Sequence, residues 1–470
     1  MTAAEPTRYD IVAYPATLFP ATHPDHLAVV ARLHGLAATA VETARVLEIA
    51  GGDGVNLIAM AAAYPRARFV SFDLSAAAVA RGRSLAAAAG LTNIRIETGD
   101  VIEAAASMPG EFDYIIVHGL YAWVPEPVRT AALALIGRVL APDGAAFVSY
   151  NALPGGHMRR IVRDLLLHHV GGIADPAAKA RRAREVLADF AVPRATDRPV
   201  MTGVRDVARP MLKQSLETLY HDELSDVYAP QALADVVAAA AHGLAFLNDA
   251  SPSMMSDGFP GADVAEADVV AHAQAGDFAA MVFFHQTLLV RAGRQPARAV
   301  AQAALPDLYV AARAERTGAE TFRLDDSEFG VGDAMLADAL EDLAKIWPQR
   351  VKLAALVDGA DRWHAVYRLF CAEVLTLHAS PLPGVVEPGE QPRANPVARA
   401  QIAAGQPHLF TLDHHVITMD AAGPRAFLML LDGSRNRERL GADWAASGHG
   451  HEVDVATALA QVARIPMLIG

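Results

Sequence analysis

Short apolar runs alternate with helical segments from Arg45 to Asn151, and this alternation limits the possible folds more than any other feature. The runs RVLEIA, ARFVSFD, NIRIETG, FDYIIVH and AAFVSYN predict five strands. The intervening and following segments predict helices over residues 54–63, 75–89, 101–107, 126–140 and 157–169. Strands that alternate with helices form a parallel sheet covered on both faces. We therefore predict an α/β protein with a doubly wound, Rossmann-like sheet.

The pattern changes after residue 170. Residues 171–230 are largely helical and contain Pro193, Pro199 and Pro210, which predicts a helical insertion that serves as a cap or a dimer contact. The stretches ALADVVAAAAHGLAFLNDA and MVFFHQTLLVRA predict a sixth and a seventh strand of the same sheet. The predicted domains are residues 1–170 with 231–295 for the sheet, 296–390 for a middle winged-helix-like domain, and 391–470 for a C-terminal α+β, winged-helix-like domain.

Composition limits the partners and the compartment. The chain has 470 residues, of which 53% are hydrophobic, and a formal net charge of −13. This acidic balance argues against general nucleic-acid binding, because phosphate neutralisation needs a face rich in Lys and Arg. A single cysteine, Cys371, excludes an intramolecular disulfide and fits a reducing compartment. With no secretory signal and no uncharged apolar stretch of spanning length, we expect a cytoplasmic chain without membrane insertion.

No metal site is predicted. The consecutive side chains of His221, Asp222 and Glu223 cannot all face one ion on a helix or a strand, and this stretch is expected to begin a helix. The pair His414 and His415 has no third and fourth ligand at the spacing of a metal site and is expected in a polar strand or turn.

A glycine-rich turn, EIAGGDG from Glu48 to Gly54, follows the first predicted strand. Such a turn lets the backbone approach a ligand closely, and the next helix points its positive N-terminus at that ligand. The dinucleotide spacing G-x-G-x-x-G fails, because the third position counted from Gly52 is Leu57. Glu48 ends the strand, where its carboxylate can help to orient a cationic amino-acid group.

Two further acids end the next two strands. Asp73 closes the second strand, where a carboxylate can accept both hydroxyls of a ribose. Asp100 follows the third strand and could bind an exocyclic adenine amine, while Val101 and Ile102 pack on the ring. One acid at a strand end is often only the N-cap of the next helix. Three at consecutive strand ends favour a site for an adenosine-containing cofactor.

These residues resemble the class I S-adenosyl-methionine methyltransferases and their turn E-x-G-x-G-x-G, with Ala50 in place of the first glycine. The segments YDIVAYPATLFPATHPDHL, HGLYAWVP, SYNALPGGHMR, YHDELSD and HQTLLVRA resemble bacterial methyltransferases with a methyltransferase regulatory domain, a group that includes rickettsial protein-lysine methyltransferases. The resemblance implies S-adenosyl-methionine as cofactor and S-adenosyl-homocysteine as product, and it suggests a homodimer. The expected cofactor-binding residues are Tyr14, Glu48, Ala50, Gly51, Gly52, Gly54, Asp73, Leu74, Asp100, Val101 and His118.

The methyl acceptor is expected beside the ends of the fourth and fifth strands, where ligands bind in open α/β sheets. The expected catalytic residues are Tyr121, Asn151 and His118, and the expected substrate-side residues are Tyr9, Trp123, Tyr150 and His157. Aromatic faces stabilise a sulfonium or an ammonium by cation-π attraction. His118 and His157 are candidate proton acceptors. The leader that carries Tyr9, Tyr14 and His23 is expected either to cover the cofactor or simply to pack against the sheet.

Three functions remain open from the sequence. The first is an N-methyltransferase that acts on a protein or peptide, with lysine favoured by the resemblance. The second is an N- or O-methyltransferase for a small molecule or a biosynthetic peptide. The third is a regulatory protein that binds the cofactor without turnover, which only Ala50 favours.

Overall fold

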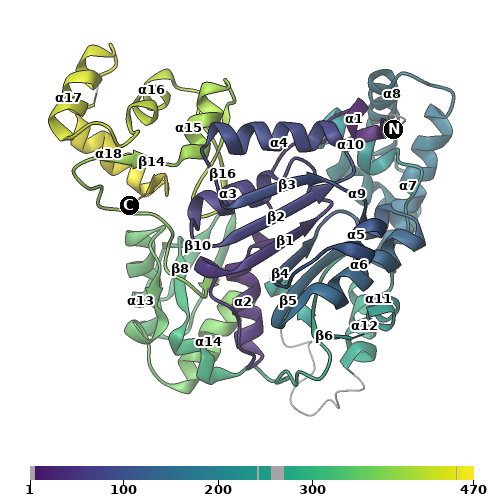
Figure 1. Ribbon diagram of the computed structural model, residues 1–470. Coiled ribbons are helices and arrows are strands. Elements are labelled where there is room, and N and C mark those ends of the chain that lie inside the picture. Colours follow the sequence, from purple (N-terminus) through teal and green to yellow (C-terminus); the bar gives the residue numbers. More distant parts are fainter. Residues whose placement is uncertain (1–5, 241–242, 256–268, 451–452, 470) are drawn as a thin grey trace.

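Seven strands form one central sheet in the computed structural model, which describes residues 6–240, 243–255, 269–450 and 453–469. The strands are β1 (Arg45–Ile49), β2 (Arg68–Asp73), β3 (Ile94–Thr98), β4 (Phe112–Val117), β5 (Leu140–Asn151), β6 (Leu244–Asp249) and β7 (Phe284–Arg291). Their order across the sheet is β3-β2-β1-β4-β5-β7-β6 (Figure 1). The predicted doubly wound fold is confirmed, and the strand order reverses between β1 and β4, where such sheets bind ligands.

The first five strands pair in parallel and alternate with the predicted helices. These helices are α3 (Val55–Ala63), α4 (Ala76–Ala88), α5 (Val101–Ser107), α6 (Glu126–Val139) and α7 (Gly155–Val170). All six residues of β4 are buried, as expected for a central strand between two helical layers. The strand β5 begins earlier than predicted, because α6 ends at Val139 and the chain continues directly into the sheet at Leu140.

The last two strands complete the sheet as predicted. Helix α11 (Leu233–Ala240) precedes β6, with residues 241–242 outside the described ranges, and α12 (Val269–Ala280) precedes β7. Strand β7 is antiparallel to both β5 and β6. At its start, the two ring nitrogens of His285 lie 2.9 Å from Asp249 and 3.0 Å from Asp277. Burial lowers the pKa of His285, but the two carboxylates outweigh it and raise that pKa to about 9.

Three helices fill the predicted insertion: α8 (Pro176–Phe190), α9 (Pro199–Met211) and α10 (Leu216–Glu223). They pack with α7 around an apolar cluster of their own. One prediction is wrong here, because His221, Asp222 and Glu223 end α10 instead of beginning a helix. The helix starts earlier since Ser215 is its N-cap, accepting a hydrogen bond from the Thr218 N–H at 3.0 Å.

The middle segment packs directly on the sheet domain. It contains α13 (Ala334–Ile346) and α14 (Ala360–Cys371), an antiparallel sheet of β8 (Tyr309–Ala312), β12 (Val351–Lys352) and β13 (Leu375–His378), and a second sheet of β9 (Glu315–Arg316), β10 (Thr321–Leu324) and β11 (Ser327–Gly330). Its apolar side chains share one core cluster with those of α2 (Pro24–Leu33). The buried Asp25 of α2 binds the Ser380 hydroxyl at 2.7 Å and the Ala379 N–H at 3.0 Å. The apolar core is therefore continuous across residue 296, and the domain boundaries stay a prediction.

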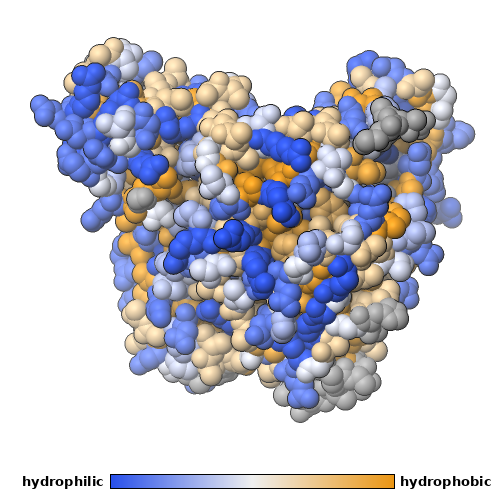
Figure 2. Space-filling view, in the orientation of Figure 1, coloured by the Kyte–Doolittle hydropathy of each residue, from blue (hydrophilic) through white to orange (hydrophobic). Residues whose placement is uncertain are grey.

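The C-terminal module, residues 390–469, contains α15 (Pro396–Ala403), α16 (Ala422–Leu430), α17 (Arg437–Ala446) and α18 (Val455–Arg464). Short strand pairs join β14 (Arg393–Ala394) to β17 (Leu468–Ile469) and β15 (His408–Phe410) to β16 (Val416–Thr418). Helix α15 packs against α3 and α4. In Figure 1 this module and the helices α7 to α9 lie on opposite sides of α4, and the outline of the molecule in Figure 2 dips between them.

Neither a membrane span nor a metal cluster is found in the part of the chain that the structure describes. No helix there is long and apolar enough to cross a bilayer. No group of three or more His, Cys, Asp and Glu side chains there could hold an ion.

Candidate functional site

The turn after β1 has three residues in the left-handed backbone region. Ala50, Gly52 and Gly54 have φ values of 57°, 60° and 69°. Glycine adopts this region freely, whereas an L-residue such as Ala50 does so at a cost of roughly 1–2 kcal/mol. A Cβ on Gly52 would meet nothing within 4 Å, so this part of the turn is open to a ligand. Gly54 instead begins α3, and a Cβ on Gly51 would collide with the side chains of Glu48 and Ser71.

Glu48 is a buried acid with one free oxygen, at 4% exposure. Its Oε1 accepts a hydrogen bond from the Asn56 amide at 2.8 Å, and its Oε2 has no partner among the described residues. Burial raises the pKa of Glu48 to about 8, and the nearby charges of Asp53 and Asp73 act in the same direction. A buried carboxyl of this kind is stabilised by a cationic ligand. The observation fits the amino group that the sequence analysis assigned to this position.

Asp73 joins the ends of two strands. Its Oδ2 accepts the Gly52 N–H at 2.9 Å and its Oδ1 accepts the Ser75 N–H at 2.8 Å. An ionised carboxylate has about four acceptor positions, so two remain for the hydroxyls of a ligand. Burial raises the pKa of Asp73, which the two N–H donors partly offset.

Two exposed aliphatic side chains flank the acids at the ends of β2 and β3. Leu74 is 58% exposed and Ile102 is 49% exposed, although both are large hydrophobic residues. Asp100 caps α5 by accepting the Ile102 N–H at 2.6 Å. Val101, which was expected to pack on an adenine ring, is 8% exposed and belongs to the apolar cluster beneath, and its contact with a ring stays a prediction. Leu74 and Ile102 present the apolar surface that a ring needs.

The N-terminal leader crosses this edge of the sheet. At one end, Asp10 of α1 (Arg8–Ile11) binds the Ser75 hydroxyl at 2.5 Å and the Ala77 N–H at 3.2 Å, next to Asp73. At the other end, the Phe19 N–H donates to Asn56 Oδ1 at 3.2 Å. The leader therefore packs along the edge from the end of β2 to the start of α3, a position that both expectations for it include.

Between these anchors the leader meets the end of α10, a contact that the sequence analysis did not foresee. The ring of Tyr9 stacks on His221 with 4.4 Å between centroids, and His221 Nε2 lies 2.8 Å from the Val12 carbonyl. The Tyr14 hydroxyl donates to Asp222 Oδ1 at 3.3 Å. Burial raises the pKa of Asp222 to about 6, although Arg159 lowers it. The motif YHDELSD contains His221 and Asp222, which contact the leader. The sequence alone led us to expect only the start of a helix there.

His118 follows β4 and lies beneath the leader. Its ring centroid is 3.9 Å from that of Phe19, and its Nδ1 lies 2.9 Å from the Ser149 hydroxyl. Burial lowers the pKa of His118 to about 4. A histidine with so low a pKa is neutral at pH 7 and is a weak proton acceptor, which argues against the expected role as a base.

The residues expected at the end of β5 have different environments. Asn151 is 4% exposed and its Oδ1 lacks a partner among the described residues, so it can still accept a hydrogen bond. The expected role of Tyr150 at the acceptor wall is wrong, because its ring is in the core and its hydroxyl is 2.8 Å from Thr287 Oγ1. Tyr121 is also buried and packs on Tyr150 with centroids 5.9 Å apart. His157 is exposed in the first turn of α7.

Trp123 belongs to an aromatic and cationic group beside α10. Its ring lies 5.3 Å from the guanidinium carbons of both Arg159 and Arg163 and 5.3 Å from the ring of Tyr228. The fully buried Glu223 binds Arg159 at 2.5 Å. Asp222 Oδ2 is farther from Arg159, at 3.9 Å, and its side chain remains 23% exposed. This neighbour of the buried pair therefore keeps a carboxylate oxygen for a ligand.

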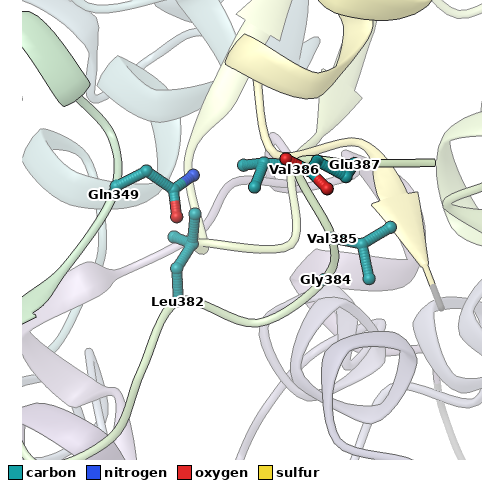
Figure 3. A pocket seen from close by; sticks show the side chains of 6 residues that line it. All are labelled: Gln349, Leu382, Gly384, Val385, Val386 and Glu387. Atoms are coloured by element: carbon teal, nitrogen blue, oxygen red, sulfur yellow. The ribbon is translucent and has the colours of Figure 1, made fainter.

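A hollow of about 340 Å³ opens elsewhere, along the linker between the middle segment and the C-terminal module (Figure 3). Figure 3 shows Gln349, Leu382 and residues 384–387 around it. None of the predicted site residues lines this hollow.

Two segments of the chain match known protein families. Residues 46–144 match the family described as methyltransferase domain, and residues 390–464 match the PKMT C-terminal winged helix domain. Two uncharacterized proteins of Rickettsia prowazekii are 34% identical over 297 residues and 37% identical over 161 residues. These matches cover 61% and 34% of this chain, and 53% and 64% of the relatives. The chain thus spans about half to two thirds of the curated relatives that it matches.

Solved structures share the whole fold. PKMT2 from Rickettsia typhi superimposes with a TM-score of 0.81 at 22% identity, covering 97% of this chain and 100% of that protein. The same protein in complex with AdoHcy gives a TM-score of 0.79 at 21% identity, with the same coverage. The resemblance noted in the sequence is confirmed for the methyltransferase domain, for the winged helix at the C-terminus and for the fold that combines them.

Proposed function

We propose that this chain, which has a methyltransferase domain of the S-adenosyl-methionine-dependent fold and a PKMT-type winged helix domain, methylates lysine side chains of a protein or peptide. The main support is the arrangement of polar groups at the carboxyl edge of the sheet. Glu48, Asp73 and Asp100 lie at or just after the ends of β1, β2 and β3, in the order of the three parts of the cofactor. The R. typhi PKMT2 structure in complex with AdoHcy supports the same ligand.

Each part of the edge would hold one part of the cofactor. Glu48 would bind the ammonium of the methionine group, and the open backbone of Gly52 would lie against it. Asp73 would accept the ribose hydroxyls with its two remaining acceptor positions. Asp100, Leu74 and Ile102 would surround the adenine. When bound, the cofactor would supply a methyl group to the acceptor nitrogen, with the electron pair of the broken S–C bond left on sulfur.

The acceptor would approach between the leader and α10. Aromatic rings of Tyr9, Tyr14 and Trp123 are near this position, together with the carboxylate of Asp222. A carboxylate beside aromatic faces binds an ammonium both by its charge and by cation-π attraction. The match of residues 390–464 to the PKMT C-terminal winged helix domain supports a polypeptide rather than a small molecule as acceptor.

Proton removal limits the reaction of a lysine. The amine must be neutral to attack, and holding an unperturbed lysine neutral at pH 7 costs about 4–5 kcal/mol. Desolvation among aromatic rings lowers the lysine pKa and therefore reduces this free-energy cost. Asp222, with its pKa raised to about 6, is a better proton acceptor than an ordinary aspartate and than His118. We therefore assign to Asp222 the binding of the ammonium and the uptake of its proton.

We also propose that the protein forms a homodimer and that it is cytoplasmic. Ile161, Val192 and Val200 are 51%, 55% and 63% exposed on and beside the helices α7 to α9, an unusual exposure for large aliphatic residues. They support dimer formation through this part of the chain. The buried Cys371 is the one cysteine of the sequence, so an intramolecular disulfide is impossible, and this supports a reducing cytoplasmic compartment.

One labelling experiment separates the open functions. The full chain is incubated with radiolabelled S-adenosyl-methionine and a lysate of the native host, and macromolecules are separated from small molecules. We expect label in protein, at lysine after hydrolysis. Label only in small molecules would replace the lysine proposal by the small-molecule function. Calorimetric binding of the cofactor without any label transfer would support the regulatory protein, and absence of binding would refute the cofactor site.

A further inference from the structure

A chain of buried hydrogen bonds links the C-terminal module to the acid at the end of β1. His414 Nε2 lies 2.9 Å from Asn56 Oδ1, and the Asn56 amide donates to Glu48 Oε1 at 2.8 Å and to Thr22 Oγ1 at 3.0 Å. His414, Asn56, Glu48 and Thr22 are 3%, 3%, 4% and 0% exposed. His414 is more than 350 residues from Asn56 in sequence, so only the docking of the module brings them together.

The backbone fixes the direction of this chain. The Phe19 N–H is a donor and points at Asn56 Oδ1, at 3.2 Å. If the amide of Asn56 were reversed, its NH₂ would face this N–H, and two donors would oppose each other. Oδ1 is therefore the acceptor, and His414 must donate through a protonated Nε2. The Asn56 NH₂ group is then directed at Glu48 and Thr22.

The module holds His414 firmly in place. Val397 and Phe410 of the module share an apolar cluster with Val55 and Ile58 of α3. Phe410 is tied on both sides, its N–H to Gln401 Oε1 at 3.0 Å and its carbonyl to the Asn395 amide at 2.8 Å. His414 follows in the turn between β15 and β16, with φ of 67°, a conformation that a residue other than glycine adopts at a cost.

We infer that His414 is a positioning residue for the methyltransferase site: through Asn56 it orients the Glu48 carboxylate, so that the C-terminal module completes the cofactor pocket. This inference rests on the proposed function. His414 does not touch the cofactor position itself. A donor from the module holds Oδ1 of Asn56, the opposite end of that amide holds Glu48 Oε1, and Glu48 Oε2 is left for the ligand. The winged helix therefore has a part in cofactor binding as well as any part in recognising the substrate.

The test compares variants of the full chain by calorimetry with S-adenosyl-homocysteine. His414→Phe keeps a ring but removes the donor, and loss of one buried hydrogen bond should weaken binding about tenfold. His414→Gln restores an N–H donor and should bind within about threefold of the wild type. His415→Gln is the matched control, because His415 pairs with Asp413 at 3.3 Å and its side chain is 56% exposed. It should bind like the wild type.

Two results would overturn the inference. Wild-type affinity in a folded His414→Phe variant would show that the hydrogen bond does not position Glu48. Equal losses in His414→Phe and His414→Gln would show that only packing matters. If His414→Phe does not fold, His414→Gln still tests the inference, because a loss of affinity well beyond about threefold with the donor restored would contradict it.

A second measurement does not depend on cofactor binding. The ¹⁵N signals of the His414 ring should be those of a neutral ring protonated at Nε2. A proton at Nδ1 would contradict the direction of the hydrogen-bond chain. If the wild type bound no S-adenosyl-homocysteine but showed the Nε2–H form, the proposed function would fail while the contact itself stood.

Discussion

The carboxylate of Asp73 accepts the backbone N–H of Gly52 at 2.9 Å, so the end of β2 holds the open part of the turn that follows β1. This hydrogen bond holds the Asp73 carboxylate next to the glycine turn. The acid that would bind the ribose therefore also fixes the backbone against which the rest of the cofactor would lie. A change at Asp73 therefore acts on both.

Replacing Asp73 should abolish tight cofactor binding. Asp73→Ala removes the acceptor for two ligand hydroxyls and frees the Gly52 N–H, and charge-assisted hydrogen bonds of this kind contribute about 1.5–3 kcal/mol each. We expect the Kd for S-adenosyl-homocysteine to rise at least about 100-fold in calorimetry. Asp164→Ala, at an exposed acid on α7, is the control and should bind normally. Unchanged binding in Asp73→Ala would mean that the ribose lies elsewhere.

Replacing Ala50 by glycine should stabilise the protein. Ala50 has φ of 57°, and glycine relieves roughly 1–2 kcal/mol of backbone strain there. Glycine also stabilises the unfolded chain by about 0.4–1 kcal/mol, because it gives that chain more conformational entropy. The net expected gain in the free energy of unfolding is about 0.5–1 kcal/mol, measured by urea denaturation. Ala59→Gly, inside α3, should instead lower it. A loss of stability in Ala50→Gly would show that the backbone at Ala50 is not strained.

Cofactor affinity should increase with pH below about 8. Burial raises the pKa of Glu48 to about 8 in the free protein, so most of this carboxyl is protonated at pH 7. Because the ligand ammonium prefers the ionised form, binding releases a proton, and affinity rises as pH approaches 8. Calorimetry in two buffers of different ionisation enthalpy measures the released proton. Glu48→Gln should bind more weakly and without this proton release; the same release in that variant would place the linkage on another group.

Turnover should depend on Asp222 more than binding does. Asp222→Asn keeps the hydrogen bond from Tyr14 but cannot take up a proton at neutral pH, and loss of a general base lowers kcat about 100-fold or more. The Kd for S-adenosyl-homocysteine should change by less than about threefold. Asp226→Asn, at an exposed acid nearby, should retain full activity. An Asp222→Asn enzyme with wild-type kcat across pH 6–9 would remove Asp222 from the reaction.

The buried triad of His285 should make stability depend on pH. Its folded pKa, about 9, is above the ordinary value of 6.5, so the contribution of His285 is fully present below pH 6.5 and is lost as pH rises through 9. Each pKa unit corresponds to about 1.4 kcal/mol, which gives a total of order 3 kcal/mol. The free energies of unfolding of the wild type and His285→Gln should therefore converge between pH 6.5 and 9.5. A constant difference would show that His285 is uncharged.

Much of the site could be predicted because its residues follow strands whose order is local in sequence. Apolar runs bounded by polar residues located β1 to β5, and the ends of parallel strands necessarily meet at one edge. The acids Glu48, Asp73 and Asp100 were therefore placed correctly at that edge. Tyr150 was misjudged for a physical reason: within a strand, neighbouring side chains point to opposite faces, and sequence proximity to the edge does not decide which face is buried.

The long-range contacts could not be predicted. The sequence by itself determined the doubly wound sheet, the glycine turn and the acids at the strand ends, because periodicity and turn chemistry are properties of short segments. Only the tertiary structure decided that Asp222 of α10 meets Tyr14 of the leader and that His414 of the C-terminal module reaches Asn56. Those pairs are separated by more than 200 and more than 350 residues, and their contact depends on how whole modules dock through apolar surfaces, which no local pattern encodes.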